Sequence, residues 1–151
     1  MTASDHTPAA ADASAAAPLP LARVPIRVRW RDLDAFNHVN NASFLTFLEE
    51  ARLVWLSGID GEWTGEAFMP VLAATQLNYR RQLGWPGEVM VELSVQRIGN
   101  SSLTIAHRIV SADNADLLYG DGSVVMVWAD PVSGTSVAVP AAVRRACELR
   151  V

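Results

Sequence analysis

The chain has 151 residues, a formal net charge of −4 at pH 7, and 50% hydrophobic residues. This length and apolar content predict one globular domain with its own core, because a chain of this size buries most of its apolar surface on folding. The negative charge argues against a general nucleic-acid binder, which would carry a basic surface, and no apolar run reaches the roughly 18 residues that a membrane-spanning helix needs.

Residues 1–20 are expected to form a disordered tail, and residues 21–151 the folded domain. The tail is rich in Ala, Pro, Ser, Thr and Asp and contains no aromatic residue. It lacks the basic start and the apolar run of a secretory signal. The single cysteine, Cys147, excludes an intramolecular disulfide and fits the reducing cytoplasm. We therefore expect a cytoplasmic protein.

The folded part begins with a strand over residues 23–30. Val24, Ile26, Val28 and Trp30 alternate with residues that are mostly arginines, and this period of two predicts a half-buried strand. Pro25 cannot donate a hydrogen bond to a neighbouring strand, so it indicates either the start of a strand or the edge of a sheet.

A polar loop follows, with the sequence DLDAFNHVNN over residues 32–41. Asn40, Asn41 and Ser43 are good N-cap residues, so a helix is expected to begin between Asn41 and Ser43. The first N–H groups of a helix are free and its dipole is positive there. A carboxylate beside such an end suits a reaction that builds negative charge on a carbonyl oxygen. The same residue types also form ordinary caps and turns, so the spacing alone leaves both interpretations open.

The next element is a long helix over about residues 42–57. It is apolar over most of its circumference, with only a narrow polar stripe at Thr46, Glu49 and Glu50, and such a helix is normally buried. Gly58 stands where a helix end is expected. Residues 59–69 then form a loop that carries two aromatic residues, Trp63 and Phe68.

Four strand-like runs follow, at residues 70–80, 88–99, 102–111 and 117–129. They are separated by short segments rich in Gly, Pro, Asn and Asp, which predicts hairpins and an antiparallel sheet. His107 falls within this pattern and is expected to be a packed residue. A short strand at 136–139 and a last helix at 140–149 could complete the fold. One helix followed by consecutive strands indicates the α+β class.

Several of these segments together resemble the hotdog-fold thioesterases. The loop and helix carry Asp-Leu-Asp, three further residues, His-Val-Asn-Asn and then Glu-Ala-Arg; Asn-Tyr-Arg-Arg at 78–81, Gly-Asn-Ser-Ser at 99–102 and Gly-Asp-Gly at 120–122 follow in the order of that family. The family includes bacterial acyl-CoA and 4-hydroxybenzoyl-CoA thioesterases and plant acyl-carrier-protein thioesterases. The resemblance covers about residues 23–148 and implies a single hotdog fold, an antiparallel β-sheet wrapped around one long central α-helix.

The resemblance also implies roles for three residues of the loop. Asp34 matches the catalytic carboxylate, which acts as a nucleophile in some members and as a general base in others. The backbone N–H of Asn41 matches the helix-end amide that holds the thioester carbonyl, and His38 matches an orienting histidine. The chain departs from the plant enzymes in having Phe36 where they have an Asn, with Asn37 one place later.

Further substrate contacts are expected close to this loop. Asn40 precedes the helix, and Trp63 and Phe68 lie where this family shapes its acyl pocket, although core packing explains the two aromatics equally well. Arg80 and Arg81 are candidates for the phosphates of coenzyme A, because guanidinium groups suit phosphate oxygens. A plain surface charge is the alternative for each arginine.

We therefore expect a thioesterase that hydrolyses an acyl-CoA substrate without a metal or a cofactor, coenzyme A being part of the substrate. Three separated histidines and one cysteine provide no metal-ligand spacing. A sheet around one helix leaves edges and apolar surface uncovered, so a homodimer or homotetramer is expected, with no nucleic-acid or membrane partner. The alternatives are an acyl-carrier-protein thioesterase, an enoyl-CoA hydratase of the same fold, and a non-catalytic acyl-thioester-binding protein.

Overall fold

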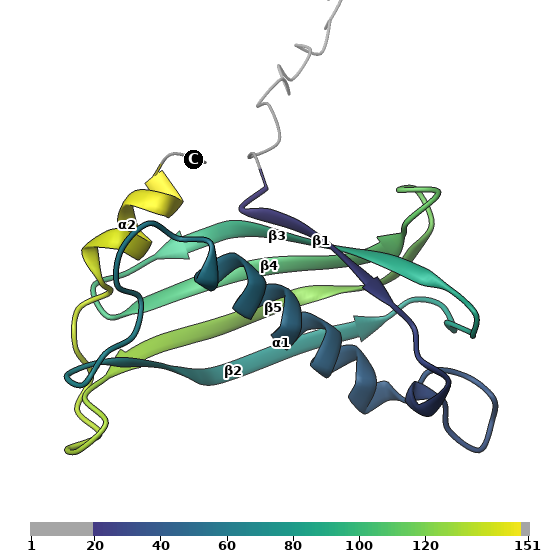
Figure 1. Cartoon of the computed structure of the whole chain (residues 1–151), viewed down its shortest axis with the longest axis horizontal. Helices are drawn as coiled ribbons and strands as arrows, with labels where there is room; N and C mark the ends of the chain where they lie inside the picture. Colours follow the sequence, from purple (N-terminus) through teal and green to yellow (C-terminus); the bar gives the residue numbers. More distant parts are fainter. Residues whose placement is uncertain (1–19, 149–151) are drawn as a thin grey trace, which may run out of the picture.

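The computed structural model describes residues 20–148 and contains one antiparallel sheet and two α-helices (Figure 1). In chain order the elements are β1 (Ala22–Arg27), a 3₁₀ helix η1 (Trp30–Asp32), α1 (Asn41–Ser57), β2 (Met69–Tyr79), β3 (Glu88–Ile98), β4 (Ser102–Ser111), β5 (Leu118–Ala129) and α2 (Ala141–Glu148). The predicted α+β class is confirmed, and the bounds of β2 to β5 agree with the expected runs to within one residue. The predicted tail lies outside the described residues apart from Pro20.

The five strands form one sheet in the order β1-β3-β4-β5-β2, and every neighbouring pair is antiparallel. The first two strands of the chain are therefore the two edges of the sheet. The inner face of β3 and β4 carries buried apolar pairs, as at Val91 opposite Ile109. The alternation of apolar and polar residues that predicted these strands is the pattern of one face buried and one face outward.

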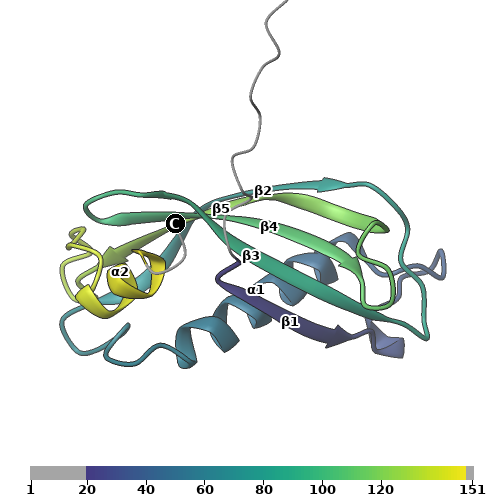
Figure 2. The ribbon, with the colours of Figure 1, turned by 90° about the horizontal axis from the view of Figure 1, so that it is seen from above.

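Helix α1 lies across the inner face of the sheet (Figure 1, Figure 2). Its backbone runs closest to β1 and β3. It buries one charged residue, Arg52, together with six apolar side chains: Phe44, Phe47, Leu48, Ala51, Trp55 and Leu56. Each large apolar side chain buried in this way contributes about 1.5–3 kcal/mol to folding. Packing of this face therefore holds α1 against the sheet.

A central helix enclosed by the sheet is not confirmed, because the side of α1 that faces away from the sheet is exposed. Leu45, Leu53 and Val54 are 43%, 49% and 49% exposed. In β2, every residue from Val71 to Gln76 is exposed as well. The sheet passes α1 on one side and does not close around it, so a single chain leaves an apolar face over α1 and β2 without cover.

Two predicted strands end differently in the structure. The first strand stops at Arg27 instead of continuing to Trp30, because the Asp32 carboxylate accepts a hydrogen bond from the Arg29 backbone N–H and turns the chain into η1. Trp30 is consequently 72% exposed. The segment at 136–139 forms only an isolated bridge between Ser136 and Ala129. The predicted last helix is confirmed as α2.

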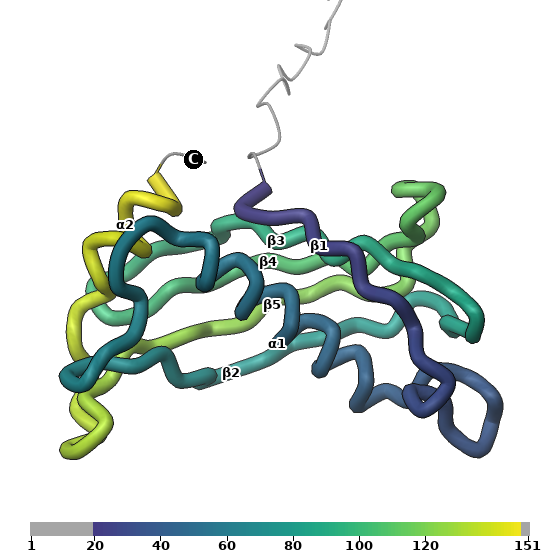
Figure 3. The backbone as a smooth tube through the Cα atoms, viewed as in Figure 1, coloured from purple at the N-terminus to yellow at the C-terminus, as the bar shows by residue number. Residues whose placement is uncertain are grey.

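The segment between α1 and β2 passes beside α2, as the tube in Figure 3 shows. A tight contact holds it there, since a Cβ added to Gly61, whose φ is +117°, would lie 2.8 Å from the Ala142 methyl carbon. The indole N–H of buried Trp128 donates a 2.8 Å hydrogen bond to the Trp63 carbonyl and ties the same segment to β5. These contacts fix Trp63 at the C-terminal end of α1.

His107 is a buried imidazole at the centre of the sheet, as expected for a packed residue. It stands opposite Gly122 and is 2% exposed. Within residues 20–148, neither ring nitrogen has a hydrogen-bond partner of standard geometry. Burial, and secondarily the nearby charge of Arg52, lowers the pKa of His107 from 6.5 to about 4. The folded protein therefore holds this side chain in its neutral form.

This pKa predicts a loss of stability in mild acid. Above pH 6.5, His107 is mostly neutral in both the folded and the unfolded chain. Below pH 6.5, the imidazole of the unfolded chain becomes protonated, whereas that of the folded chain stays neutral down to about pH 4. The free energy of unfolding should fall by about 2 kcal/mol between about pH 7 and about pH 5 from this group alone. Urea unfolding of His107→Leu at both pH values should lack that fall. An equal fall in wild type and variant would contradict the assignment.

Candidate active site

The loop between η1 and α1 borders a cavity of about 450 Å³. The start of α1 and the chain that leaves β2 complete its wall. The lining residues are Asp34, Phe36, His38, Val39, Asn41 and Phe44 from the loop and α1, and Tyr79, Arg80, Arg81 and Gln82 from the end of β2 and beyond. Three predicted catalytic residues and both predicted phosphate-binding arginines thus surround one space.

A tight turn gives the loop its shape. The Asp34 N–H donates to the His38 carbonyl at 2.8 Å, and the Asn37 N–H donates to the Asp34 carbonyl at 3.1 Å. Asn37 closes the turn with φ +61°, a left-handed conformation that Asn tolerates better than most residues. Phe36 stands at the tip and is 81% exposed. The turn therefore directs Asp34 and His38 to the same side of the loop.

The Asp34 carboxylate is half-buried, and only one of its two oxygens accepts a hydrogen bond within residues 20–148. Its Oδ1 accepts a 2.9 Å hydrogen bond from the Phe36 backbone N–H. Within residues 20–148, its other oxygen accepts no hydrogen bond and joins no ion pair. One oxygen thus orients the group, and the second is available to a water molecule or a substrate.

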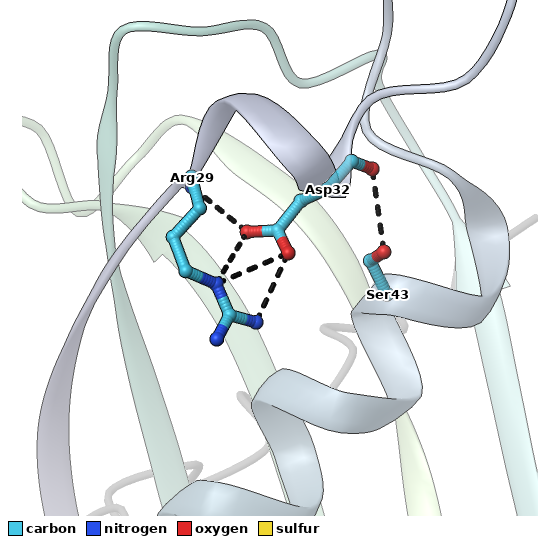
Figure 4. Close-up of polar contacts among 3 residues, drawn as sticks. All are labelled: Arg29, Asp32 and Ser43. Carbon is cyan, nitrogen blue, oxygen red and sulfur yellow. Dashed lines mark hydrogen bonds and ion pairs between the residues drawn. The ribbon is translucent and has the colours of Figure 1, made fainter.

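Asp32, two residues earlier, is a different kind of carboxylate (Figure 4). It is 4% exposed and accepts from the Arg29 backbone N–H at 2.8 Å and from the Arg29 guanidinium at 3.0 and 3.2 Å. This contact raises the pKa of Arg29. The Asp32 carbonyl accepts from the Ser43 hydroxyl at 3.3 Å and from the Asn40 N–H at 2.8 Å. Asp32 therefore fastens the loop to α1 and has no free oxygen for chemistry.

The first turn of α1 leaves one N–H group free at the cavity. The Asn40 side chain caps the helix by accepting from the Ala42 N–H at 2.8 Å, and the Asn40 carbonyl accepts from the Ser43 N–H at 2.8 Å. In the described chain, the Asn41 N–H has no acceptor, while the Asn41 carbonyl accepts from the Tyr79 hydroxyl at 3.0 Å. The free N–H stands at the positive end of the helix dipole, where a developing negative charge is stabilised.

The two arginines of the cavity differ in what holds them. Arg80 donates to Asp121 through Nε at 2.9 Å and Nη2 at 3.0 Å, and Asn78 donates to the same carboxylate at 2.9 Å. These hydrogen bonds lower the pKa of Asp121 and raise that of Arg80. The Arg81 guanidinium is exposed and makes no hydrogen bond or ion pair within residues 20–148. Of the two cavity arginines, Arg81 is therefore the one whose guanidinium has no partner in the described chain, a distinction that the sequence does not reveal.

The two aromatic residues predicted to contact substrate lie elsewhere in this chain. Trp63 lines a separate hollow along α1 with Glu49 and Leu53. Phe68 lines another cavity beside α2. Neither borders the space around Asp34. Among residues 20–148, no three His, Cys, Asp or Glu side chains group together as metal ligands, and no helix there is both long and apolar enough to span a membrane.

Comparison with known proteins gives consistent matches over this fold. The thioesterase-like superfamily matches residues 28–147. XC229 of Xanthomonas campestris, a proposed acyl-CoA thioesterase, is 48% identical with a TM-score of 0.72, over 79% of this chain and 98% of that one. A thioesterase of Thermus thermophilus, solved with coenzyme A and Zn, is 33% identical with a TM-score of 0.73, over 86% and 93%. The long-chain acyl-CoA thioesterase FadM of Escherichia coli is 28% identical over 83% of this chain and 96% of its own.

Proposed function

This chain belongs to the thioesterase-like superfamily and is a thioester hydrolase, and we propose that it cleaves acyl-CoA with Asp34 acting at the thioester carbonyl. The observation that carries this proposal is the pairing, at one cavity, of a carboxylate oxygen without a partner and a helix N–H without an acceptor. The two groups supply what thioester hydrolysis needs: activation of an attacking oxygen and stabilisation of the oxyanion.

The proposed reaction uses water and the chain's own groups. The substrate carbonyl accepts a hydrogen bond from the Asn41 N–H, and the free Asp34 oxygen either removes a proton from attacking water or attacks the carbonyl carbon itself. The first route forms the acid directly; the second forms a mixed anhydride that water then opens. In both routes the C–S bond breaks and coenzyme A leaves as the thiol after gaining a proton. His38, at the same cavity, orients the substrate.

Arg81 is the proposed contact for the phosphates of coenzyme A. Replacing it with Ala should raise KM for acyl-CoA by about tenfold and leave kcat unchanged, because a lost charge-assisted hydrogen bond to a phosphate is worth about 1.5 kcal/mol. Steady-state kinetics would measure both constants. The matching N-acetylcysteamine thioester, which has no phosphate, should show no change in KM. A similar rise with both substrates would contradict a phosphate contact.

We also propose that the enzyme is a cytoplasmic homo-oligomer. The apolar face over α1 and β2 supports this, since a monomer rarely leaves such a surface open. An acyl contact by Trp63 or Phe68 then depends on a second subunit bringing either residue to the cavity. Cys147 is buried, and burial raises its pKa to about 11, which fits an unreactive thiol in a reducing compartment.

Thiol release from a panel of substrates tests the proposal. The panel spans acetyl-, medium-chain, long-chain and benzoyl-CoA, with the same acyl groups on a carrier protein. Buried Cys147 should contribute little to the thiol signal. Turnover of a CoA ester supports the proposal and gives the acyl class, whereas turnover confined to carrier-protein esters favours the carrier-protein alternative. Loss of the double bond of crotonyl-CoA without thiol release would favour a hydratase. No turnover of any thioester would favour a binding protein.

A further inference from the structure

Arg52 is a buried cation without a counter-ion. It projects from the middle of α1, is 8% exposed, and makes no hydrogen bond or ion pair with any residue of the described chain. Burial lowers the pKa of its guanidinium, although not enough to discharge an arginine. Buried charges in proteins are nearly always paired, because an unpaired charge loses its hydration free energy and gains no ion pair or hydrogen bond that offsets the loss. The missing acceptor must come from outside this chain or from a rearranged group within it.

Arg52 lines a small cavity beside the uncovered apolar face. The cavity measures about 140 Å³ and lies between α1, β2 and β5. Apart from Arg52 and Glu49, its lining is apolar: Leu53, Leu56, Pro70, Leu72 and Met126. Leu53 and Leu72, at its rim, are 49% and 48% exposed. A surface that covers this face would therefore also reach Arg52, and the cavity has room for a carboxylate.

The same face carries a carboxylate of its own. Glu49 is exposed at the mouth of the cavity, one turn before Arg52, and both residues lie near the middle of the 17-residue α1. Within its own chain, the Glu49 carboxylate stays outside ion-pair distance of Arg52, although its charge is felt there. The face thus presents one buried donor and one exposed acceptor, and neither is paired with a residue of the described chain.

We propose that Arg52 is half of an ion pair whose carboxylate is the Glu49 side chain of a second copy of this chain. This rests on the homo-oligomer proposed above. A two-fold axis brings the same patch of both copies together, so a patch that carries both donor and acceptor is self-complementary. Two antiparallel α1 helices related by an axis between Glu50 and Ala51 would set each Glu49 level with the other copy's Arg52. The symmetry completes both pairs at once.

Charge exchange between two tagged chains tests this pairing. One chain carries Arg52→Glu and the other Glu49→Arg. Each variant alone should dimerise about 100-fold more weakly than wild type in sedimentation experiments, because two like charges meet twice at the axis. When they are co-expressed, the mixed dimer again has opposite charges in both interchain pairs. One pair joins the unchanged Glu49 and Arg52, and the other joins the two substituted positions with reversed sign. Sequential affinity purification and native mass spectrometry should then find more than about nine-tenths mixed dimers, against about half for random pairing.

The mixed dimer separates this proposal from pairing within one chain. If Glu49 and Arg52 paired within one chain, each variant chain would carry two like charges at positions 49 and 52. Mixing the two chains would then restore no ion pair and no dimer affinity. Glu50→Arg is the matched control, since Glu50 lies near Arg29 and should give no preference for Arg52→Glu. Should Arg52→Glu fail to fold, Arg52→Gln and Glu49→Gln replace the pair: each should weaken the dimer, and the double variant no further.

Three outcomes would overturn the inference. Random pairing of the two charge variants would do so, as would wild-type affinity in either variant alone, and both would leave the homo-oligomer standing. A wild-type chain that stays monomeric at tens of micromolar would overturn the ion pair and the homo-oligomer together. Thioester turnover is measured separately, so none of these results bears on the proposed chemistry.

Discussion

Replacing Asp34 with Asn should lower kcat for acyl-CoA hydrolysis by about 10²- to 10⁴-fold, the usual contribution of a catalytic base, and a nucleophile would give at least as large a loss. The amide oxygen of Asn can still accept the hydrogen bond from the Phe36 N–H that holds the turn. The free energy of unfolding should therefore change by less than about 0.5 kcal/mol. Activity against the best substrate of the panel and urea unfolding measure the two quantities.

Asp32→Asn is the matched control, since it makes the same chemical change two residues away. Asp32 accepts four hydrogen bonds from Arg29 groups within 3.2 Å and is buried. This variant should lose about 2 kcal/mol of stability, because a buried ion-paired carboxylate is replaced by a neutral group. Its folded fraction should keep far more activity than Asp34→Asn. If Asp34→Asn retains wild-type kcat, Asp34 is not the reacting carboxylate.

Gly122→Ala should destabilise the protein by about 3 kcal/mol, the upper end of the usual cost of overpacking. A Cβ at Gly122 would overlap the backbone carbonyl of Gln76 on β2, and it would also lie 3.0 Å from Nε2 of His107. Since β5 is paired with β4 on one side and β2 on the other, it cannot shift away without breaking a ladder. Urea unfolding at neutral pH measures the loss.

Gly84→Ala serves as the comparison for that change. A Cβ at Gly84 would meet nothing within 4 Å, and its backbone is not left-handed. This variant should be neutral or stabilised by a few tenths of a kcal/mol, because Ala restricts the unfolded chain. If both glycine variants lose the same stability, the loss reflects backbone propensity and the close approach of β2 to Gly122 is not its cause.

The sequence predicts most of the fold because its signals are local. Alternation sets β3, β4 and β5, glycine and asparagine mark their turns, and Asn40 caps a helix that begins at Asn41. The same locality explains the early end of β1. The hydrogen bonds from Arg29 to Asp32 redirect the chain before Trp30, and an alternation of residue types carries no information about such side-chain contacts.

The structure brings five of the predicted site residues to one cavity, Asp34, His38, Asn41, Arg80 and Arg81, but residue types alone do not show how these side chains are held. By residue type alone Asp32 and Asp34 look equivalent, as do Arg80 and Arg81, and only the resemblance distinguishes Asp34 from Asp32. They differ because one member of each pair is held by an ion pair, Asp32 by Arg29 and Arg80 by Asp121. Arg52 is not predictable for the opposite reason. It reads as one more charge on a helix, and only its burial without an acceptor in the described chain reveals it.

The two edge strands of the sheet differ in how readily they can pair with a strand of another copy, and this difference limits the size of the assembly. The β1 edge carries Pro25 between the charged Arg23 and Arg27, features that discourage strand addition. The β2 edge, MPVLAATQLNY, has no charged residue, and its one proline, Pro70, stands at the second position of the strand. If only β2 can pair with another chain, two copies join through their β2 strands, and the resulting sheet has β1 at both of its edges. Association through β2 is therefore self-terminating and cannot elongate into a fibre.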